Sequence, residues 1–292
     1  MAEKTCKHAG KPIQAISMKP VVLILALFLI VAALQSCRST RKLLYHPVPV
    51  PEERARHIRE AYPDVEQLDI KVAEDCRLHG WFIKKNPAHL PTLLYFGGNA
   101  EEVSVNIEMM HRQLNANVIM VNYRGYGNND GTPTEETLKA DALVIHDHII
   151  DSYPLKQDAL IACGRSLGSG IAAYVAWKRH LPALILISPY DSIANVAKRH
   201  FPGWLVSMAL ADKYRRTIDF SPDIRSRTLI IASQNDTVIP IVHSRRLFES
   251  LTCPKQMVLI NKAGHNDFQL HQAYWTALNN FTGTGQPARC VE

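Results

Sequence analysis

The 292-residue sequence lacks the patterns that mark several common classes of protein. It has no internal repeat at the periods of solenoids or propellers and no low-complexity tract, which excludes a repeat array. Its six cysteines lie far apart, so zinc-ribbon and redox motifs are absent, and they are too sparse for a disulfide scaffold. We therefore expect no metal site. Disulfide pairing among Cys76, Cys163, Cys253 and Cys290 is left open.

Excess charge is missing from most of the chain. The net charge is +6, but residues 1–42 hold seven basic side chains and one acidic one, which leaves 26 of each sign in the rest. The excess therefore flanks the apolar run near the N-terminus. This is typical of a membrane-targeting segment and not of a nucleic-acid-binding face. We expect membrane lipid as a partner and no nucleic acid.

The chain also has no apolar run long enough for an ordinary membrane-spanning helix. The longest, Val21–Leu34, has 14 residues, whereas a span needs about 20. If translation begins at Met18, a short basic region precedes this run and Cys37 follows it, which resembles a bacterial lipoprotein signal with residues 34–37 as the lipobox. The resemblance implies cleavage before Cys37, lipids on this residue, and a location in the bacterial cell envelope facing the periplasm. An uncleaved signal anchor is the alternative.

Beyond the signal (residues 1–37), we expect a tether, one domain and a tail. Residues 38–66 are basic and then proline-containing, which is typical of an extended tether. Residues 67–282 form the predicted domain, and 283–292 form a flexible tail.

Within the domain, short apolar runs alternate with stretches of helical period. The first two runs predict an antiparallel pair, and the later ones are continuous enough in apolar residues for parallel strands covered on both faces. The order predicts a doubly wound α/β domain with a mostly parallel sheet of about eight strands. The eight runs are 68–72, 77–83, 92–96, 117–123, 159–163, 183–188, 227–233 and 256–261.

Two stretches between the strands carry more specific expectations. Thr132 to Glu135 has the spacing of a capping box, with proline at the first helical position. Residues 190–222 interrupt the strand–helix rhythm and predict a small helical excursion over one end of the sheet. Its apolar side chains either line an acyl pocket or touch lipid, or, as we favour, bury the excursion's own apolar face. They are Phe201, Trp204, Leu205 and Met208.

Ser166 stands between two glycines in a GxSxG pentapeptide, residues 164–168. A strand-like run precedes it and an alanine-rich stretch of helical character follows it. Strand, sharp turn and helix is the context in which this serine becomes a nucleophile, because the turn lifts the hydroxyl clear of the sheet. We interpret Ser166 as the nucleophile.

A serine nucleophile needs a base and a group that orients the base. Asp236 follows the predicted strand at 227–233, and His265 follows the predicted strand at 256–261. The three residues therefore occur in the order Ser, Asp, His that this context predicts. The alternative interpretation of Asp236 is a turn residue that caps the next helix, a common role of aspartate. Asp191, after the preceding strand, is the alternative acid.

An oxyanion hole would complete such a site with two amides. The Leu167 amide, at the start of a helix, is the first candidate. The second is the Asn99 amide, because Gly97 and Gly98 permit unusual dihedral angles and Asn99 is expected to open a helix. The alternative is a tight glycine turn in which Asn99 is only an N-cap.

Taken together, these motifs resemble serine hydrolases of the α/β-hydrolase superfamily. The chain is most similar to the lid-poor, membrane-tethered branch that includes protein depalmitoylases and bacterial hydrolases. The resemblance covers residues 43–282 and implies Ser166 as nucleophile, Asp236 as acid and His265 as base. One departure is Gly97, where the family usually has histidine. The motifs that carry it are LLYHP (43–47), YFGGNAEE (95–102), NYRGYGNNDGTPTEE (122–136), CGRSLGSG (163–170), SPYDS (188–192), ASQNDTVIP (232–240) and AGHNDF (263–268).

The expected chemistry is acyl transfer from an ester or thioester through an acyl-enzyme, with no cofactor. The substrate is a small molecule or an acylated compound. A peptidase or amidase with the same triad is the first alternative. The second is a non-catalytic envelope lipoprotein that uses the fold as a binding scaffold. The sequence does not indicate an oligomeric state.

Overall fold

A computed structural model describes residues 44–198 and 216–283 of the chain. The predicted signal with Cys37, the four apolar residues Phe201, Trp204, Leu205 and Met208, and nearly all of the predicted tail lie outside these ranges. In the described ranges, no helix is both long and apolar enough to cross a membrane.

The core of the molecule is one eight-stranded sheet with the order β1-β2-β4-β3-β5-β6-β7-β8. The first two strands pair antiparallel with each other, and β2 pairs antiparallel with β4, whereas all later pairs are parallel. Each predicted apolar run overlaps one strand, so the predicted doubly wound α/β fold is confirmed. The strands are β1 (Val65–Ala73), β2 (Cys76–Ile83), β3 (Thr92–Phe96), β4 (Asn117–Val121), β5 (Leu160–Arg165), β6 (Ala183–Ile187), β7 (Arg227–Ala232) and β8 (Lys255–Leu259).

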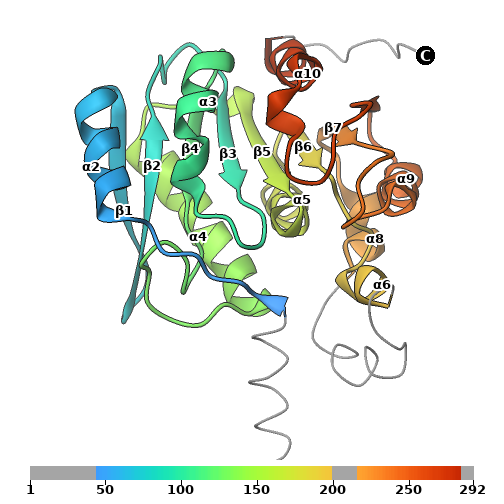
Figure 1. The fold of residues 1–292 in the computed structure, drawn as a ribbon, viewed down its shortest axis with the longest axis horizontal. Helices are drawn as coiled ribbons and strands as arrows, with labels where there is room; N and C mark the ends of the chain where they lie inside the picture. The colour runs from blue at the N-terminus through green and yellow to red at the C-terminus, as the bar shows by residue number, and fades with distance from the viewer. Residues whose placement is uncertain (1–43, 199–215, 284–292) are drawn as a thin grey trace, which may run out of the picture. The chain divides into compact units, whose positions relative to one another are not determined.

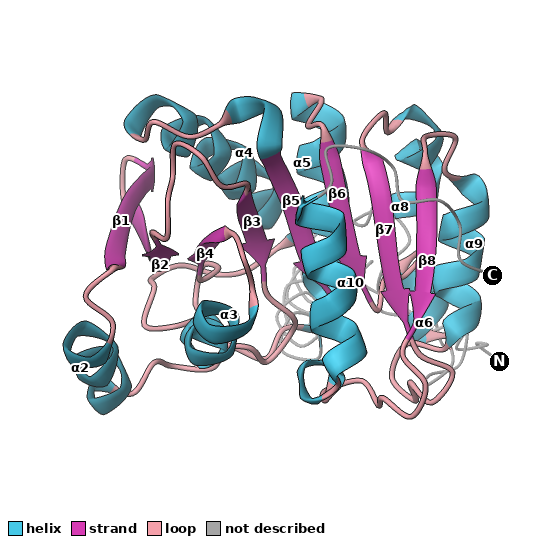
Figure 2. Cartoon of the chain, turned by 90° about the horizontal axis from the view of Figure 1, so that it is seen from above, coloured by secondary structure: helices cyan, strands magenta, loops and turns pink. Residues whose placement is uncertain are grey.

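Helices cover both faces of this sheet (Figures 1 and 2). On one face lie α2 (Glu52–Ala61), α3 (Ile107–Gln113) and α10 (Gln272–Gly283), and on the other lie α4 (Glu135–Ser152), α5 (Leu167–Arg179), α8 (Thr217–Phe220) and α9 (Ile241–Ser250). Alternate residues of a strand enter opposite cores: in β3, Leu93 packs with the first group of helices and Leu94 with the second. This explains why the central strands are apolar throughout, since both faces are buried.

The predicted tether is only partly extended. Residues 45–51 carry no helix or strand, but α2 occupies Glu52–Ala61 and β1 begins at Val65. The helix buries Ala55 and Ile58 against the sheet. Residues 52–66 therefore belong to the folded domain, because this short amphipathic helix has an apolar surface to pack against.

The capping box of α4 lies two residues later than we predicted. Thr134, not Thr132, is the N-cap: its hydroxyl accepts from the Thr137 amide at 3.1 Å, and the Thr137 hydroxyl accepts from the Thr134 amide at 2.9 Å. Pro133 therefore precedes the helix. A threonine at the third helical position replaces the usual glutamate and satisfies the same backbone donors.

The helical excursion is described only at its two ends. After β6, the short helix α6 (Ile193–Ala197) begins it, and α8 with the 3₁₀ turn Ser221–Asp223 ends it. In Figure 2, α6 lies near the carboxyl ends of the strands, whereas α8 and the turn lead back to the amino end of β7, where Thr252 donates to the carbonyl of Pro222. Phe220 is fully buried in the core beside α5, which anchors the returning segment.

Candidate active site

Ser166 occupies a sharp turn between β5 and α5. Its backbone has φ of +51° and ψ of −118°, outside the regions that side-chain-bearing residues ordinarily adopt. The turn is held because the Ser166 amide donates to the carbonyl of Ile187 at the end of β6. Such strain persists only where the surroundings enforce it, and it is typical of functional sites. The predicted strand–turn–helix context of Ser166 is present.

The two glycines that flank this turn are required by close backbone approach. A Cβ on Gly164 would lie 2.1 Å from the carbonyl oxygen of Gly168, and one on Gly168 would lie 2.1 Å from the carbonyl oxygen of Phe96. Both distances are far below van der Waals contact with rigid backbone. Glycine is therefore required at both positions, because α5 packs too closely against β5 and β3 there for a side chain.

Ser166, Asp236 and His265 come together although Ser166 and His265 are 99 positions apart in the chain. His265 Nε2 lies 3.0 Å from Ser166 Oγ, and His265 Nδ1 lies 2.8 Å from Asp236 Oδ2. The side chains of His265 and Asp236 are nearly buried, at 9% and 1% exposure. These contacts have the geometry that a nucleophile, its base and an acid orienting the base would need.

Asp236 is held by more than His265. Its Oδ1 accepts from the amides of Val238 (2.9 Å) and Ile239 (2.8 Å), and its Oδ2 also accepts from the hydroxyl of Ser188. Burial alone would raise the pKa of Asp236, but the hydrogen bonds from His265, Ser188 and Ile239 outweigh burial and lower the pKa below its ordinary value. Asp236 is thus kept as a carboxylate.

Ser188 is a site residue that sequence reasoning missed. It follows β6 with φ of +46°, and its Oγ lies 3.3 Å from His265 Nδ1 in addition to its bond with Asp236. The available signal was its place at the carboxyl end of a parallel strand, where such sheets present polar residues that bind or react.

Asp191, the alternative acid, has a different partner. Its Oδ1 lies 2.8 Å from His243 Nδ1, and its Oδ2 accepts from the Asn195 side chain at 3.0 Å. His243 lies on α9, so this buried pair connects the loop after β6 and the start of α6 to α9. Among the described residues, Asp191 forms its hydrogen bonds and ion pairs with groups other than His265. Asp191 is therefore paired with His243, and Asp236 is paired with His265.

The predicted oxyanion donors both border the cleft beside Ser166. In the described part of the chain, neither the Leu167 amide nor the Asn99 amide donates a hydrogen bond to the protein. Asn99 does not open a helix, contrary to our expectation, because the next helical turn starts at Val103 and is capped by Glu102. The alternative interpretation of Asn99 as an N-cap is excluded on the same ground.

The side chain of Asn99 instead binds the start of the described chain. Asn99 Nδ2 donates to the carbonyl of Leu44 at 2.7 Å, and Asn99 Oδ1 accepts from the His46 amide at 3.0 Å and from the Tyr126 hydroxyl at 2.7 Å. We call residues 44–46 the N-terminal strap. The strap also forms one wall of the cleft, so residues that follow the predicted anchor directly are part of the site.

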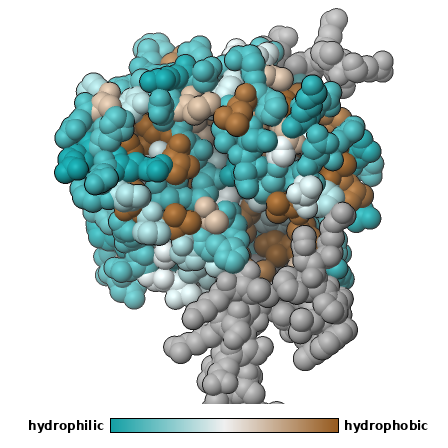
Figure 3. Space-filling view, viewed as in Figure 1, coloured by the Kyte–Doolittle hydropathy of each residue, from teal (hydrophilic) through white to brown (hydrophobic). Residues whose placement is uncertain are grey.

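The cleft over Ser166 has a volume of about 410 Å³, within the range of small-molecule sites. Figure 3 shows a largely hydrophilic face on which apolar side chains gather in a hollow low in the view. In the described ranges, no group of histidine, cysteine or acidic residues is arranged to hold a metal ion, and Cys76, Cys163 and Cys253 form no disulfide. The apolar and aromatic residues of the cleft are Leu44, Tyr45, Ala100, Leu167, Tyr190, Ile193, Val196, Ala197, Val238 and Ile239.

Comparison with known proteins places this geometry in a family. No protein-family model matches the chain. The alpha/beta hydrolase domain-containing protein WAV2 of Arabidopsis thaliana is 30% identical over 71% of this chain and 74% of its own length. YNL320W of Saccharomyces cerevisiae, named an uncharacterized membrane protein, is 31% identical over 74% of this chain and 78% of its own.

A solved structure agrees with these relatives at the level of the fold. The Pyrococcus furiosus esterase Pf2001 superposes with a TM-score of 0.63, covering 82% of this chain and 98% of the esterase at 15% identity. From the sheet order, the turn at Ser166 and the relatives of about 30% identity, the chain belongs to the α/β-hydrolase superfamily of hydrolases.

Proposed function

We propose that this protein is a serine hydrolase that cleaves an ester or thioester through an acyl-enzyme on Ser166. The observation that carries the proposal is the continuous chain of contacts from Ser166 Oγ to His265 Nε2 (3.0 Å) and from His265 Nδ1 to Asp236 Oδ2 (2.8 Å). A binding scaffold has no need for a strained serine aligned with a buried histidine–aspartate pair.

The proposed reaction has two halves. Ser166 Oγ attacks the acyl carbonyl while His265 Nε2 takes the serine proton, and His265 then returns that proton to the leaving alcohol or thiol. Asp236 accepts from His265 Nδ1, which fixes the ring tautomer and stabilises the positive charge. Water, activated by His265 in the same way, then releases the acid and restores the serine. No cofactor takes part in either step.

The oxyanion formed during attack is stabilised by the amides of Leu167 and Asn99. Both border the cleft beside Ser166 and have no protein acceptor in the described chain, so they are available to a substrate oxygen. The Leu167 amide also lies at the N-terminus of α5, whose dipole favours negative charge.

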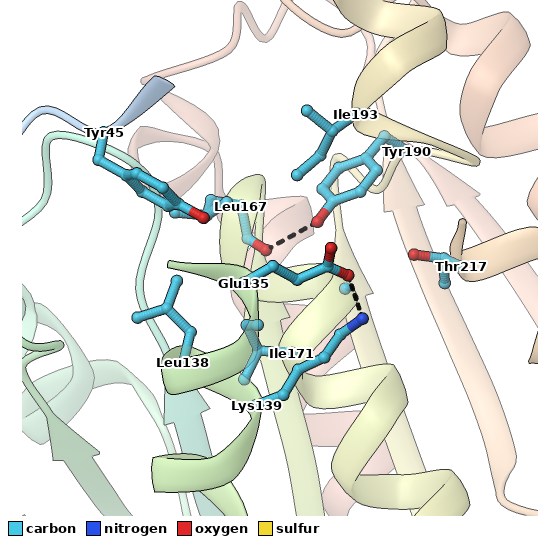
Figure 4. A pocket seen from close by; sticks show the side chains of 10 residues that line it. Tyr45, Glu135, Leu138, Lys139, Leu167, Ile171, Tyr190, Ile193 and Thr217 are labelled. Carbon is cyan, nitrogen blue, oxygen red and sulfur yellow. Dashed lines mark hydrogen bonds and ion pairs between the residues drawn. The ribbon is translucent and has the colours of Figure 1, made fainter. Parts of the chain in front are cut away.

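The lining of the cleft supports an apolar acyl group as the preferred substrate class. Ten apolar or aromatic residues line the cleft of about 410 Å³ beside Ser166. A second pocket on the other side of Leu167, drawn in Figure 4, is lined by the Glu135–Lys139 ion pair among other residues and has about 10 Å³ of free volume, room for one water. The acyl chain would therefore lie in the cleft over Ser166 and not in this second pocket.

The decisive test is Ser166→Ala with two readouts, turnover of p-nitrophenyl esters and labelling by a fluorophosphonate probe. We expect turnover to fall by roughly 10³- to 10⁶-fold and labelling to vanish, with an unchanged circular dichroism spectrum. Undiminished labelling of the variant would place the nucleophile at another residue. No turnover and no labelling of the wild-type chain would favour the binding scaffold.

A peptidase or amidase remains the nearest rival, since the same three residues also serve amide cleavage. Rates on matched substrates that share one acyl group, as ester, thioester and aminoacyl amide, separate the two. We expect the ester and thioester to be hydrolysed much faster than the amide. A faster amide would assign the protein to the peptidases.

We also propose that the chain is held at the membrane of the bacterial cell envelope by lipids on Cys37, with residues before Cys37 removed. The apolar run and the basic residues around it support this, as does the yeast relative that is named a membrane protein. Cys37→Ser should release or mislocalise the protein. The intact mass of membrane-extracted protein tests the proposal, and an unlipidated chain that retains residues before Cys37 would contradict it.

A further inference from the structure

An ion pair that the proposed mechanism does not use lies beside Ser166. Arg165, the residue between Gly164 and the serine, pairs with Glu101 at 2.7 Å, and their side chains are 17% and 5% exposed. Arg165 lines the same cleft as Ser166 and His265. Removing two charges from water is costly and is repaid only where both are well hydrogen-bonded. Both side chains of the pair form further hydrogen bonds that compensate for this cost.

The Glu101 carboxylate fixes the glycine turn that precedes Asn99. Its Oε2 accepts from the Gly98 amide at 2.8 Å as well as from Arg165. Its Oε1 accepts from the Tyr95 hydroxyl and the Asn106 side chain, both at 2.7 Å. Gly98 directly precedes Asn99, so holding the Gly98 amide toward Glu101 determines the direction of the next amide along the chain.

The guanidinium of Arg165 reaches the loop that carries the base. While Nη1 donates to Glu101, Nη2 donates to the carbonyl of His265 at 2.9 Å and to the Asn266 side chain at 2.7 Å. The His265 backbone lies in a loop beyond β8, with no helix or strand of its own to hold it. Arg165 supplies that support from the nucleophile's own turn.

We propose that Arg165 and Glu101 are positioning residues that hold three parts of the site in register: the turn before Asn99, the nucleophile and the base. The proposal rests on the proposed function. Arginine suits this task because its planar, permanently charged group presents several donors in fixed directions. A lysine has one nitrogen, which cannot satisfy the Glu101 and His265 acceptors with the same geometry.

The consequence for catalysis is specific. Misplacement of a reacting group by about 1 Å can cost on the order of 100-fold in rate without loss of substrate affinity. We expect Arg165→Met to lower kcat for a p-nitrophenyl ester by about 30- to 100-fold, with KM within about 3-fold of wild type. Arg165→Lys should keep part of that rate, because it retains the charge opposite Glu101.

The chain offers a matched control. Arg124 pairs with Asp141 on α4 through two bonds of 2.6 and 2.7 Å. The side chains of Arg124 and Asp141 are 17% and 5% exposed, which are the values of Arg165 and Glu101. Arg124→Met removes an equally buried arginine that does not touch Ser166, His265 or the glycine turn. A purely structural role predicts equal effects for the two substitutions, whereas the positioning role predicts a loss of kcat for Arg165→Met alone.

The experiment measures kcat, KM and the melting temperature of the purified full-length chain in detergent, for Arg165→Met, Arg165→Lys, Arg124→Met and Arg124→Lys. A kcat for Arg165→Met within 3-fold of Arg124→Met, or a loss carried by KM, would overturn the proposal. If Arg165→Met does not fold, the two lysine variants decide by the same criterion. Ser166→Ala is assayed alongside, since retained turnover in that variant would show that the proposed function itself has failed, which distinguishes this failure from a failure of the positioning role alone.

Discussion

The two buried aspartates of the site differ in what they hold. Asp236 orients His265 against Ser166, whereas Asp191 holds His243 on α9 and the side chain of Asn195 at the start of α6. Each carboxylate already has a histidine of its own. Exchange of roles between them would require both loops to move, so loss of one aspartate cannot be compensated by the other.

Asp236→Asn should therefore abolish most turnover, by about 10³- to 10⁴-fold, because asparagine keeps the shape but favours the wrong tautomer of His265 and cannot stabilise its positive charge. Asp191→Asn should leave kcat within about 10-fold of wild type and mainly lower the melting temperature. Ester turnover and thermal unfolding of both variants give the ranking. The reverse order of the two rates would assign the acid to Asp191.

The second prediction at this scale concerns the Ser188 hydroxyl. Because the pKa of Asp236 in the folded protein lies below its ordinary 3.8, its charged form stabilises the fold above about pH 4, and this stability is lost as the pH falls through the folded value. Ser188→Ala removes one of the bonds that lower this pKa. The variant should be less stable than wild type at pH 7, and the gap should shrink toward pH 3. Urea unfolding between pH 3 and 7 measures it, and a gap that widens on acidification would contradict the explanation.

At the scale of single elements, the sequence predicted the positions of the strands more accurately than the start of helix α4. All eight apolar runs overlap strands, because burial on both faces leaves a continuous apolar signal. The α4 box was misplaced since Thr132, Pro133 and Thr134 offer two similar starts, and only the threonine at position 137 distinguishes them.

Thr134→Ala should destabilise the protein by about 1 kcal/mol, the usual cost of losing a helix N-cap hydroxyl. Thr132→Ala should change the free energy of unfolding by much less, because only its backbone carbonyl contacts the box. Urea unfolding of both variants is the measurement. Equal losses would show that the cap is shared between the two threonines.

The crossing of β5 and α5 leads to a stronger prediction. Gly168→Ala places a methyl group 2.1 Å from the Phe96 carbonyl, which is rigid strand backbone, so we expect loss of several kcal/mol or failure to fold. Gly283→Ala in α10 is the control, since nothing lies within 4 Å of its added carbon. The soluble yield and melting temperature of the two variants should differ widely. A folded, stable Gly168→Ala chain would contradict the packing described for the turn.

How much of the site the sequence predicts depends on how local the signal is. The turn at Ser166 was predictable from the pentapeptide and the strand and helix around it, and the nearness of Asp236 and His265 from their places after strands. The contacts of Arg165 with Glu101, of Ser188 with His265, and of His46 with Asn99 were not, because they join residues 64, 77 and 53 positions apart with no fixed spacing. Only the folded sheet brings such residues together.

At the scale of the whole molecule, the excess positive charge is confined to the proposed anchor, and the rest of the chain is balanced. Residues 43–292 hold 26 basic and 26 acidic side chains, so the folded domain has little electrostatic attraction of its own for an anionic membrane. We expect a chain that begins at Leu43 to remain in solution with anionic vesicles, whereas the full-length chain binds them. Co-sedimentation with vesicles tests this, and binding of the shortened chain would show a membrane-facing patch on the domain itself.

The N-terminal strap places a sharp limit on where such a chain can be cut. Leu44 and His46 hold the side chain of Asn99 and border the cleft, and the predicted anchor ends only a few residues before them. Under the proposed anchoring, a cut before Leu44 would free the domain with the strap still bound to Asn99, and we expect that product to keep its turnover. A cut after His46 would also remove the backbone groups that hold Asn99, and we expect turnover to fall. Release and loss of turnover are therefore expected to differ by only three residues of chain.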